Sequence, residues 1–260
     1  MSNTDSESFV RAFARGLSVI DAMGKGSRRK TIAQIADASA LPRSVAKRLL
    51  LTLCEQEYAE TDGKSFALTP KVLSLGLSYL YTQPYWPVAQ PALEELRSHV
   101  GESCSMGVLH GTEIVYVLRI PSQRILATNL SVGSRLPAHL VSIGRVLLAA
   151  LPEAAWRDYV QAAAPRAGPV KAGVWARELR EHLDRIQRDG YAWIDGVLDP
   201  AIAGIGVPVR DASGQPIAAI NVSLIAGTCD EKEAVRRFLV PLRRAAEQIR
   251  ATMPRGDQGG

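Results

Sequence analysis

The sequence predicts an α+β fold, in which a winged helix-turn-helix domain precedes a larger domain with an antiparallel sheet flanked by helices. Residues 31–61 carry two helix patterns joined by a tight turn, followed by a short hairpin pattern. A Pro-Tyr-Trp-Pro break follows at residues 84–87, and beyond it helices and hairpin-linked strands occur without strict β-α-β alternation. We therefore expect a winged helix-turn-helix over residues 8–70, a linker helix over 71–85 and a second domain over 86–253.

The first predicted helix spans residues 8–23. An apolar stripe recurs along it at helical spacing, formed by Phe9, Phe13, Leu17 and Ile20. Arg11 and Arg15 lie away from this stripe, so we expect them to contact a phosphate backbone.

The helix-turn-helix follows. Its first helix places Ile32, Ile35 and Ala36 on one face, and its turn is Ser39-Ala40-Leu41. Pro42 suits the first turn of the second helix, which has Val45, Leu49 and Leu53 on one side. The exposed side of its N-terminal turns is basic and hydroxyl-rich, which suits a helix that enters the DNA major groove. The candidate DNA contacts are Pro42, Arg43, Ser44, Lys47 and Arg48.

A two-stranded wing is predicted next, from residues 58–60 and 66–68 with a turn at Asp62-Gly63. Lys64 and Ser65 lie at its tip, where they are expected to meet a phosphate. The helix predicted over residues 71–81 is apolar on more than one side, which indicates a role in dimerisation. Paired readers of this kind dock on half-sites roughly 34 Å apart.

Charge is unevenly distributed along the chain. The formal net charge is +5, yet the segment from Arg11 to Arg48 holds nine basic and two acidic residues, which leaves the remainder at −2. A basic segment on a near-neutral body is typical of DNA binding, although a solvated basic surface has the same composition. Together with the helix-turn-helix pattern, it favours double-stranded DNA as a partner.

Several other classes are disfavoured. The start lacks the apolar core of a signal peptide, and no apolar run reaches the roughly 18 residues of a membrane span. Three scattered cysteines indicate a reducing cytoplasm, and they share no metal-ligand spacing with the four histidines. The chain contains no G-x-S-x-G and no phosphate-binding P-loop motif. We therefore expect a cytoplasmic protein without cofactor, metal or membrane contact that is not an enzyme; a small-molecule-processing enzyme is the disfavoured alternative.

The second domain is predicted to alternate helices and strands. The expected helices are residues 88–100, 140–150, 152–160, 177–189 and 232–253, and the expected strands are 104–110, 113–120, 125–130, 192–197, 202–210 and 216–224. Gly190 is a suitable C-cap for the helix that ends at residue 189.

Two sets of motifs in this domain carry a family resemblance. The first is SVGSRLPA at residues 131–138 with SIGRVLLA at 142–149, and the second is Gly-Tyr-Ala at 190–192 with VPVRD at 207–211. With the N-terminal winged helix-turn-helix, the chain resembles the IclR family of bacterial transcription regulators over nearly its full length. The phrasing NLSVGSRLPA…GRVLLA is most similar to the branch that controls aromatic-acid catabolism, the protocatechuate and p-hydroxybenzoate regulators of the β-ketoadipate pathway.

The resemblance implies a DNA operator as partner, a GAF-like effector domain and a homodimer or tetramer. It implies a small aromatic acid as effector, with an aliphatic oxo acid or short-chain acid as the alternative. Carried over by position, the implied effector contacts are Ser142, Gly144, Ile202, Gly204, Asn221 and Ser223. The chain departs from the family pattern at Gly204 and Gly206 and retains only Asp195 of an acidic pair, which predicts an enlarged pocket or displaced polar contacts.

The residues themselves support an acid-binding pocket. An aromatic acid needs an apolar slot for its ring and a few convergent donors for its carboxylate. The helix start at residues 139–142 offers backbone N–H groups and a positive dipole end, to which His139 and Ser142 add side chains. Further candidates are Ser105 and either Arg124 or Arg135.

Three of these assignments have structural alternatives. A histidine such as His139 is more often exposed, or hydrogen-bonded within the protein, than a ligand contact. Ser142 is suited equally to capping a helix and to contacting a ligand. Asn221, within an apolar run, must be hydrogen-bonded if buried, and either a neighbouring group or a ligand can be its partner.

Overall fold

The computed structural model describes residues 9–122, 130–166 and 172–252. Contacts divide the chain into two compact units, one ending at Thr82 and the other beginning at Gln83. Arg124 and almost all of the predicted strand 125–130 lie outside the described residues. No helix within the described ranges is both long enough and apolar enough to cross a membrane.

The first unit is a winged helix-turn-helix, as predicted. Its helices are α1 (Arg11–Met23), α2 (Ile32–Ala38) and α3 (Arg43–Glu55), and its wing pairs β1 (Ala59–Thr61) with β2 (Phe66–Leu68) in antiparallel register. Thr31 and Gln34 form a capping box at the start of α2, which satisfies two backbone N–H groups there. Lys30 pairs with Phe66 by backbone bonds, and its ammonium donates to the carbonyls of Ala22 and Met23 at the end of α1.

The side that α1 buries differs from its most apolar stripe. Val19, Ala22 and Met23 enter the core, whereas Phe9, Phe13 and Leu17 are exposed. In α3 the fully buried side chains are Ala46 and Leu50, while Leu49 and Leu53 are only partly covered. The core of the unit combines large side chains, such as Ile35, Leu50 and Phe66, with small ones, while the Phe13 and Leu17 side of α1 lies outside it.

The predicted linker helix begins with a 3₁₀ turn, Pro70–Val72, and continues as α4 (Leu73–Tyr81). Leu73, Leu75, Leu77 and Tyr81 are exposed along it. The helix therefore presents apolar surface on several sides.

The second unit contains a six-stranded antiparallel sheet in the order β5-β4-β3-β8-β7-β6. The strands are β3 (Ser103–His110), β4 (Glu113–Ile120), β5 (Arg135–Pro137), β6 (Ala192–Asp195), β7 (Ile202–Arg210) and β8 (Pro216–Ile225). The hairpins β3–β4 and β7–β8 confirm the predicted pattern. Strand β5 was not predicted, because three residues that include an arginine and a proline carry no strand signal.

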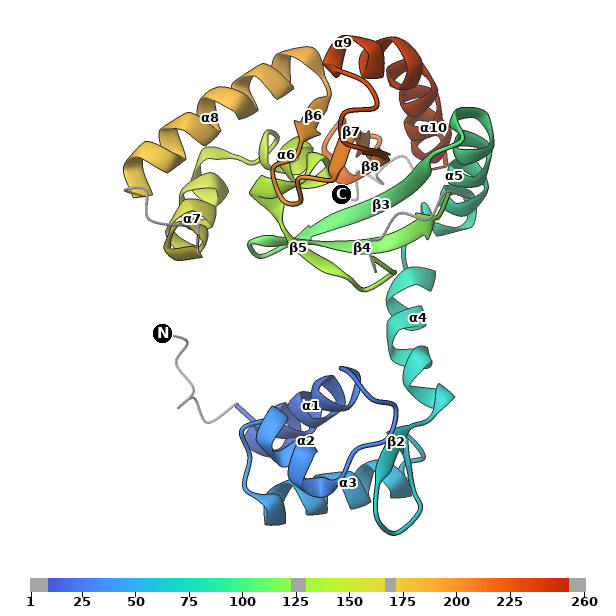
Figure 1. Ribbon diagram of the computed structural model, residues 1–260, viewed down its shortest axis with the longest axis vertical. Helices are drawn as coiled ribbons and strands as arrows, with labels where there is room; N and C mark the ends of the chain where they lie inside the picture. Colours follow the sequence, from blue (N-terminus) through green and yellow to red (C-terminus); the bar gives the residue numbers. More distant parts are fainter. Residues whose placement is uncertain (1–8, 123–129, 167–171, 253–260) are drawn as a thin grey trace, which may run out of the picture. The chain divides into compact units, whose positions relative to one another are not determined.

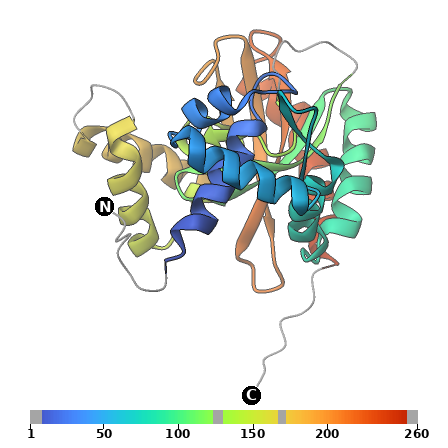
Figure 2. The ribbon, with the colours of Figure 1, turned by 90° about the horizontal axis from the view of Figure 1, so that it is seen from below.

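Helices cover both faces of this sheet. α5 (Trp86–Val100) and α10 (Val240–Arg250) pack together on one face, and α6 (Ser142–Leu148) packs on the other against β3, β7 and β8. α7 (Glu153–Ala163) and α8 (Ala172–Asp189) join the core that forms around α6. Figures 1 and 2 show the α7–α8 pair and the α5–α10 pair on opposite sides of the sheet.

The helix predicted over residues 232–253 consists of three pieces. They are α9 (Glu231–Ala234), a π-helical segment over Val235–Leu239, and α10. Pro241 has no N–H to donate four residues back, so the ordinary helical bond is missing just where the wider π turn occurs.

Candidate functional site

A cavity lies in the second unit, between the sheet and the start of α6, on the sheet face that α6 covers. Its walls are mainly apolar and include Tyr116, Leu136, Leu140, Val141 and Ile194. Its few polar side chains are Arg119, Ser142, Asp199, Asn221 and Ser223. An apolar slot with a small number of polar groups is the usual form of a site for a small organic ligand.

Glycines allow α6 to lie against the sheet beside this cavity. A Cβ atom added at Gly206 would lie 3.3 Å from the Cβ of Ser142, and one at Gly204 would lie 3.4 Å from the Ser142 Oγ. A Cβ at Gly144 would collide with the backbone of Ala138. The space left by Gly206 is therefore occupied by Ser142, whereas Gly204 itself lines the cavity. Gly144 is required for close packing and is not among the lining residues.

Asn221 is the most deeply buried polar residue of the cavity lining after Ser142, with 5% of its surface exposed. Its Nδ2 donates to the Oγ of Ser223 at 3.2 Å and to the Oγ of Ser142 at 3.4 Å. Its Oδ1 is buried and has no hydrogen-bond partner among the described residues. Ser142 thus contacts Asn221 and does not cap α6, whose N-cap is Val141 without a side-chain hydrogen bond.

Arg119 is the arginine that the described structure places at this cavity, and it was not among the predicted site residues. It lies on β4, and its Nη1 donates to the Oγ of Ser105 at 3.0 Å. Ser105 pairs with Arg119 on one side and with Asn221 on the other, so the three residues form a row across β4, β3 and β8. Ser105 is not itself a lining residue, but its hydroxyl accepts the hydrogen bond from Arg119. Arg119 carries no ion pair with a described carboxylate. A lone arginine in the otherwise apolar run 114–120 was the available sequence signal.

The structure places Arg135 elsewhere. Its Nε contacts the Oε2 of Glu113 at 2.9 Å, and 46% of its side chain is exposed. Its register opposite Val115 in the edge strand β5 accounts for this position. Arg124 lies outside the described residues; among the described arginines, Arg119 lines the cavity and Arg135 does not.

His139 lies behind the cavity and not in its lining. Its Nδ1 is 3.0 Å from the hydroxyl of Tyr159, and its ring meets Trp175 edge-on at 5.2 Å between centroids. Burial, with Arg145 nearby, lowers the pKa of His139, which favours the neutral ring. Burial also raises the pKa of Tyr159 to about 12. Arg145 donates to the carbonyl of His139 and is partly buried, so this cluster joins the segment before α6 to α7 and α8.

Asp199 is a second charged group of the cavity that sequence reasoning missed. It follows β6 in a turn, where its Oδ1 accepts a hydrogen bond from the N–H of Ala201 at 2.9 Å. Ile202 lines the cavity nearby, and Ser223 does so from β8.

The DNA-reading candidates occupy the surface of the first unit. Pro42 is the N-cap of α3, and the basic and hydroxyl side chains that follow it are exposed: Arg43, Ser44, Lys47 and Arg48. Arg11 and Arg15 are exposed on α1. Lys47 and Arg48 form no ion pair with the described carboxylates, so their charges are available to phosphate.

The wing tip is held by a carboxylate. Asp62 accepts hydrogen bonds from the N–H groups of Lys64 and Ser65 at 2.9 and 2.8 Å, and from the Ser65 hydroxyl at 2.9 Å. Arg29 donates to the same carboxylate at 3.1 Å and to Glu60 at 2.8 Å. Led by the backbone hydrogen bond from Ser65, these contacts lower the pKa of Asp62 to about 2. The Ser65 hydroxyl therefore shapes the turn, while the side chain of Lys64 is exposed at the tip.

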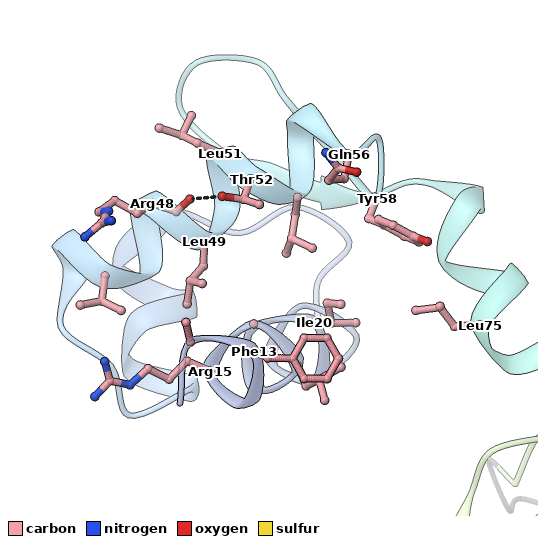
Figure 3. Close-up of a pocket in the computed structure, with 15 residues that line it drawn as sticks. Phe13, Arg15, Ile20, Arg48, Leu49, Leu51, Thr52, Gln56, Tyr58 and Leu75 are labelled. Carbon is pink, nitrogen blue, oxygen red and sulfur yellow. Dashed lines mark hydrogen bonds between the residues drawn. The ribbon is translucent and has the colours of Figure 1, made fainter. Parts of the chain in front are cut away.

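An open apolar groove runs between α1 and α3 in the same unit. Figure 3 shows Phe13 and Ile20 of α1 on one side and Leu49 of α3 on the other, with Leu75 of α4 at one end. Arg15 and Arg48 lie toward the opposite end. The exposed stripe of α1 thus faces this groove instead of the core.

Two family descriptions match the chain. The description "IclR helix-turn-helix domain" matches residues 12–63, and "Bacterial transcriptional regulator IclR C-terminal" matches residues 78–251.

The chain is similar to several known proteins along nearly its whole length. It is 36% identical to the Pca regulon regulatory protein of Pseudomonas putida, over 95% of this chain and 85% of that protein. It is 29% identical to the p-hydroxybenzoate hydroxylase transcriptional activator of Acinetobacter baylyi, over 94% of this chain and 92% of that one. A crystal structure of an IclR homologue from Microbacterium hydrocarbonoxydans, in complex with 4-hydroxybenzoate, superposes with a TM-score of 0.78 at 25% identity, over 93% of this chain and 98% of that one.

Proposed function

Since the chain belongs to the IclR family of bacterial transcription regulators, we propose that it binds operator DNA and responds to a small aromatic carboxylic acid of the protocatechuate or p-hydroxybenzoate type. Its targets would be genes of aromatic catabolism, as the names of its relatives suggest. The observation that carries the effector assignment is an apolar cavity with Arg119 in its wall. As a regulator of bacterial DNA, it is expected to act in the cytoplasm and not as an enzyme.

The chemistry of the cavity suits an aromatic acid. Tyr116, Leu136 and Val141 offer the apolar surface that a benzene ring requires. The guanidinium of Arg119 offers two parallel N–H groups, which match the two oxygens of a carboxylate. Ser105 holds this guanidinium toward Asn221, so its direction is set before a ligand arrives.

DNA reading is assigned to the exposed side of α3 and to the wing. Arg43, Ser44, Lys47 and Arg48 would enter the major groove, and Lys64 would contact the backbone beside it. Arg11 and Arg15 would add backbone contacts from α1. Arg48 lies at the rim of the apolar groove, so its contact depends on what covers that groove.

A homodimer is the assembly that fits this surface. Phe13 and Leu17 on α1 and Phe9 just before it are exposed, and α4 adds Leu73 and Leu75. Phe13, Leu17 and Leu75 line one groove, and an exposed apolar area of this kind indicates a protein contact. A second copy would cover it and supply the second recognition helix that two half-sites require. A tetramer would be a pair of such dimers.

The test uses the full chain. Duplexes selected from a random pool identify the operator, and fluorescence anisotropy then measures its affinity with and without candidate acids. Selective modulation by an aromatic acid supports the proposal, whereas modulation by a short-chain oxo acid alone would retain the family and overturn the effector class. Binding of the acid without any change in operator affinity, oligomeric state or transcription would overturn the regulatory role.

A further inference from the structure

The amide of Asn221 is satisfied at one end only. Its Nδ2 has two acceptors, the hydroxyl oxygens of Ser142 and Ser223. Its Oδ1 has less than 1 Å² exposed and meets no donor of the described residues. Nδ2 is the end of the amide that faces the two serines, so Oδ1 is the end turned away from them.

The surrounding strands do not supply the missing donor. On β7 the position that pairs with Asn221 is Gly206, and its neighbour along the same face is Gly204. Neither residue has a side chain. On the other side Ser105 pairs with Asn221; its hydroxyl accepts from Arg119 and forms no hydrogen bond with Oδ1. A buried carbonyl oxygen without a donor is unfavourable, so a donor from outside the chain gains the full benefit of pairing with it.

The free acceptor and the guanidinium belong to one row. Arg119, Ser105 and Asn221 lie side by side on β4, β3 and β8, so the outer two backbones are two strand spacings apart, about 10 Å. Arg119 reaches inward to Ser105, which shortens the distance between the charged group and the amide oxygen. A benzoate ring with a hydroxyl opposite its carboxylate has its two polar ends arranged to span such a gap.

We propose that Asn221 determines effector specificity by accepting, at Oδ1, a hydrogen bond from a ring hydroxyl opposite the carboxylate that Arg119 holds. The chain then selects hydroxylated benzoates over benzoates that lack this donor. The inference rests on the proposed function, because it concerns an aromatic acid in this cavity. Asp199, the other carboxylate of the lining, lies on the β6–β7 turn with one oxygen engaged by its own backbone, and it is not needed for this contact.

The test is a calorimetric titration of the full chain with three acids: 4-hydroxybenzoate, 4-fluorobenzoate and benzoate. Fluorine has nearly the size of the hydroxyl but cannot donate. We expect 4-hydroxybenzoate to bind about 10- to 100-fold more tightly than the other two, because they leave the amide oxygen unpaired. This comparison needs no variant, so it remains decisive even if a substitution at the site prevents folding.

A variant then assigns the preference to the residue. Asn221→Leu has similar volume and no acceptor, and we expect the ratio between 4-hydroxybenzoate and 4-fluorobenzoate to shrink to within about threefold. The thermal melting of each protein checks that it is folded.

The failures are distinguishable. Equal affinity of the unaltered chain for all three acids would overturn the hydroxyl contact and leave the aromatic effector in place. The same conclusion would follow if Asn221→Leu kept the affinity ratio between 4-hydroxybenzoate and 4-fluorobenzoate of the unaltered chain. Binding of aliphatic acids but of no benzoate would overturn the proposed effector class and this inference with it.

Discussion

Replacing Arg119 by glutamine removes the cationic group that the described structure places in the cavity lining, and it tests how the acid is held. Glutamine retains an amide that can donate to Ser105, so the sheet around it should be preserved. The substitution therefore removes the positive charge and the paired N–H groups while leaving the apolar wall intact.

The expected magnitude follows from the type of contact. A hydrogen bond to a charged group contributes about 1.5–3 kcal/mol, and a two-pronged guanidinium–carboxylate contact lies toward the upper part of that range. Each 1.4 kcal/mol is a tenfold change in affinity, so Arg119→Gln should weaken binding of the acid by about 10- to 150-fold. The partial burial of the guanidinium argues against strong screening by salt.

The assay is calorimetric titration of the full chain with 4-hydroxybenzoate, followed by operator binding without effector. Arg135→Gln is the matched control, because Arg135 is paired with Glu113 at the surface and does not line the cavity. It should change the affinity for the acid by less than about twofold. Operator affinity without effector should be retained in both variants.

Two results would refute the reasoning. An Arg119→Gln protein that binds the acid within about twofold of the unaltered chain would show that the carboxylate is held elsewhere. An equal loss in Arg135→Gln would show that a general field of positive charge, and not a direct contact, attracts the acid.

Four other substitutions or conditions test the first unit and the packing of α6. Phe13→Asp should weaken self-association by at least about tenfold in sedimentation, because it places a charge in the exposed apolar stripe; an unchanged dimer would exclude this surface. The lowered pKa of Asp62 means that its contribution to wing order is complete above about pH 4 and is lost as the pH falls through about 2; amide resonances of the wing turn should report that midpoint, and a midpoint near 4 would contradict the contacts described. Lys30→Met should lower the free energy of urea unfolding by about 1–3 kcal/mol, because two carbonyls at the end of α1 lose their donor, whereas exposed Lys25→Met should stay within about 0.5 kcal/mol. Gly144→Ala should destabilise the chain by about 3 kcal/mol or more in the same assay, since its Cβ has no room; a neutral effect would mean that α6 can shift.

Much of the fold was readable because its signals are local. The proline at position 42 and the apolar runs 202–210 and 216–224 are local signals, and the helix-turn-helix, wing and hairpins were confirmed. The interior of the last helix was not predicted. It contains a π-helical segment before Pro241, whose missing N–H interrupts the ordinary helical hydrogen bonds.

The faces that become buried were harder to predict. On α1 the larger apolar stripe was the stronger sequence signal, yet the core takes Val19, Ala22 and Met23. The reason is that sequence periodicity does not state which of two apolar faces meets a partner in the same unit; the packing of the helices decides it.

The candidate site also contains residues that the sequence indicated and residues that only the structure identified. Asn221 stood out in the sequence because an amide in an apolar strand needs a partner, and the structure places it in the cavity lining with its oxygen free. Arg119 did not stand out, because its importance comes from its register beside Ser105 on a neighbouring strand. His139 and Arg135 were plausible by proximity along the chain, but one packs behind the cavity and the other pairs at a sheet edge.

By itself, the sequence determined the class of protein: a basic helix-turn-helix, a second α+β domain and the family motifs that join them. These properties follow from composition, periodicity and short-range spacing, which the linear chain contains in full. Only the tertiary structure decided which arginine reaches the cavity, which serine holds it and which atom of Asn221 remains unpaired. Those contacts join strands that are up to about a hundred residues apart in sequence, and strand register, set by the packing of the whole sheet, brings them together.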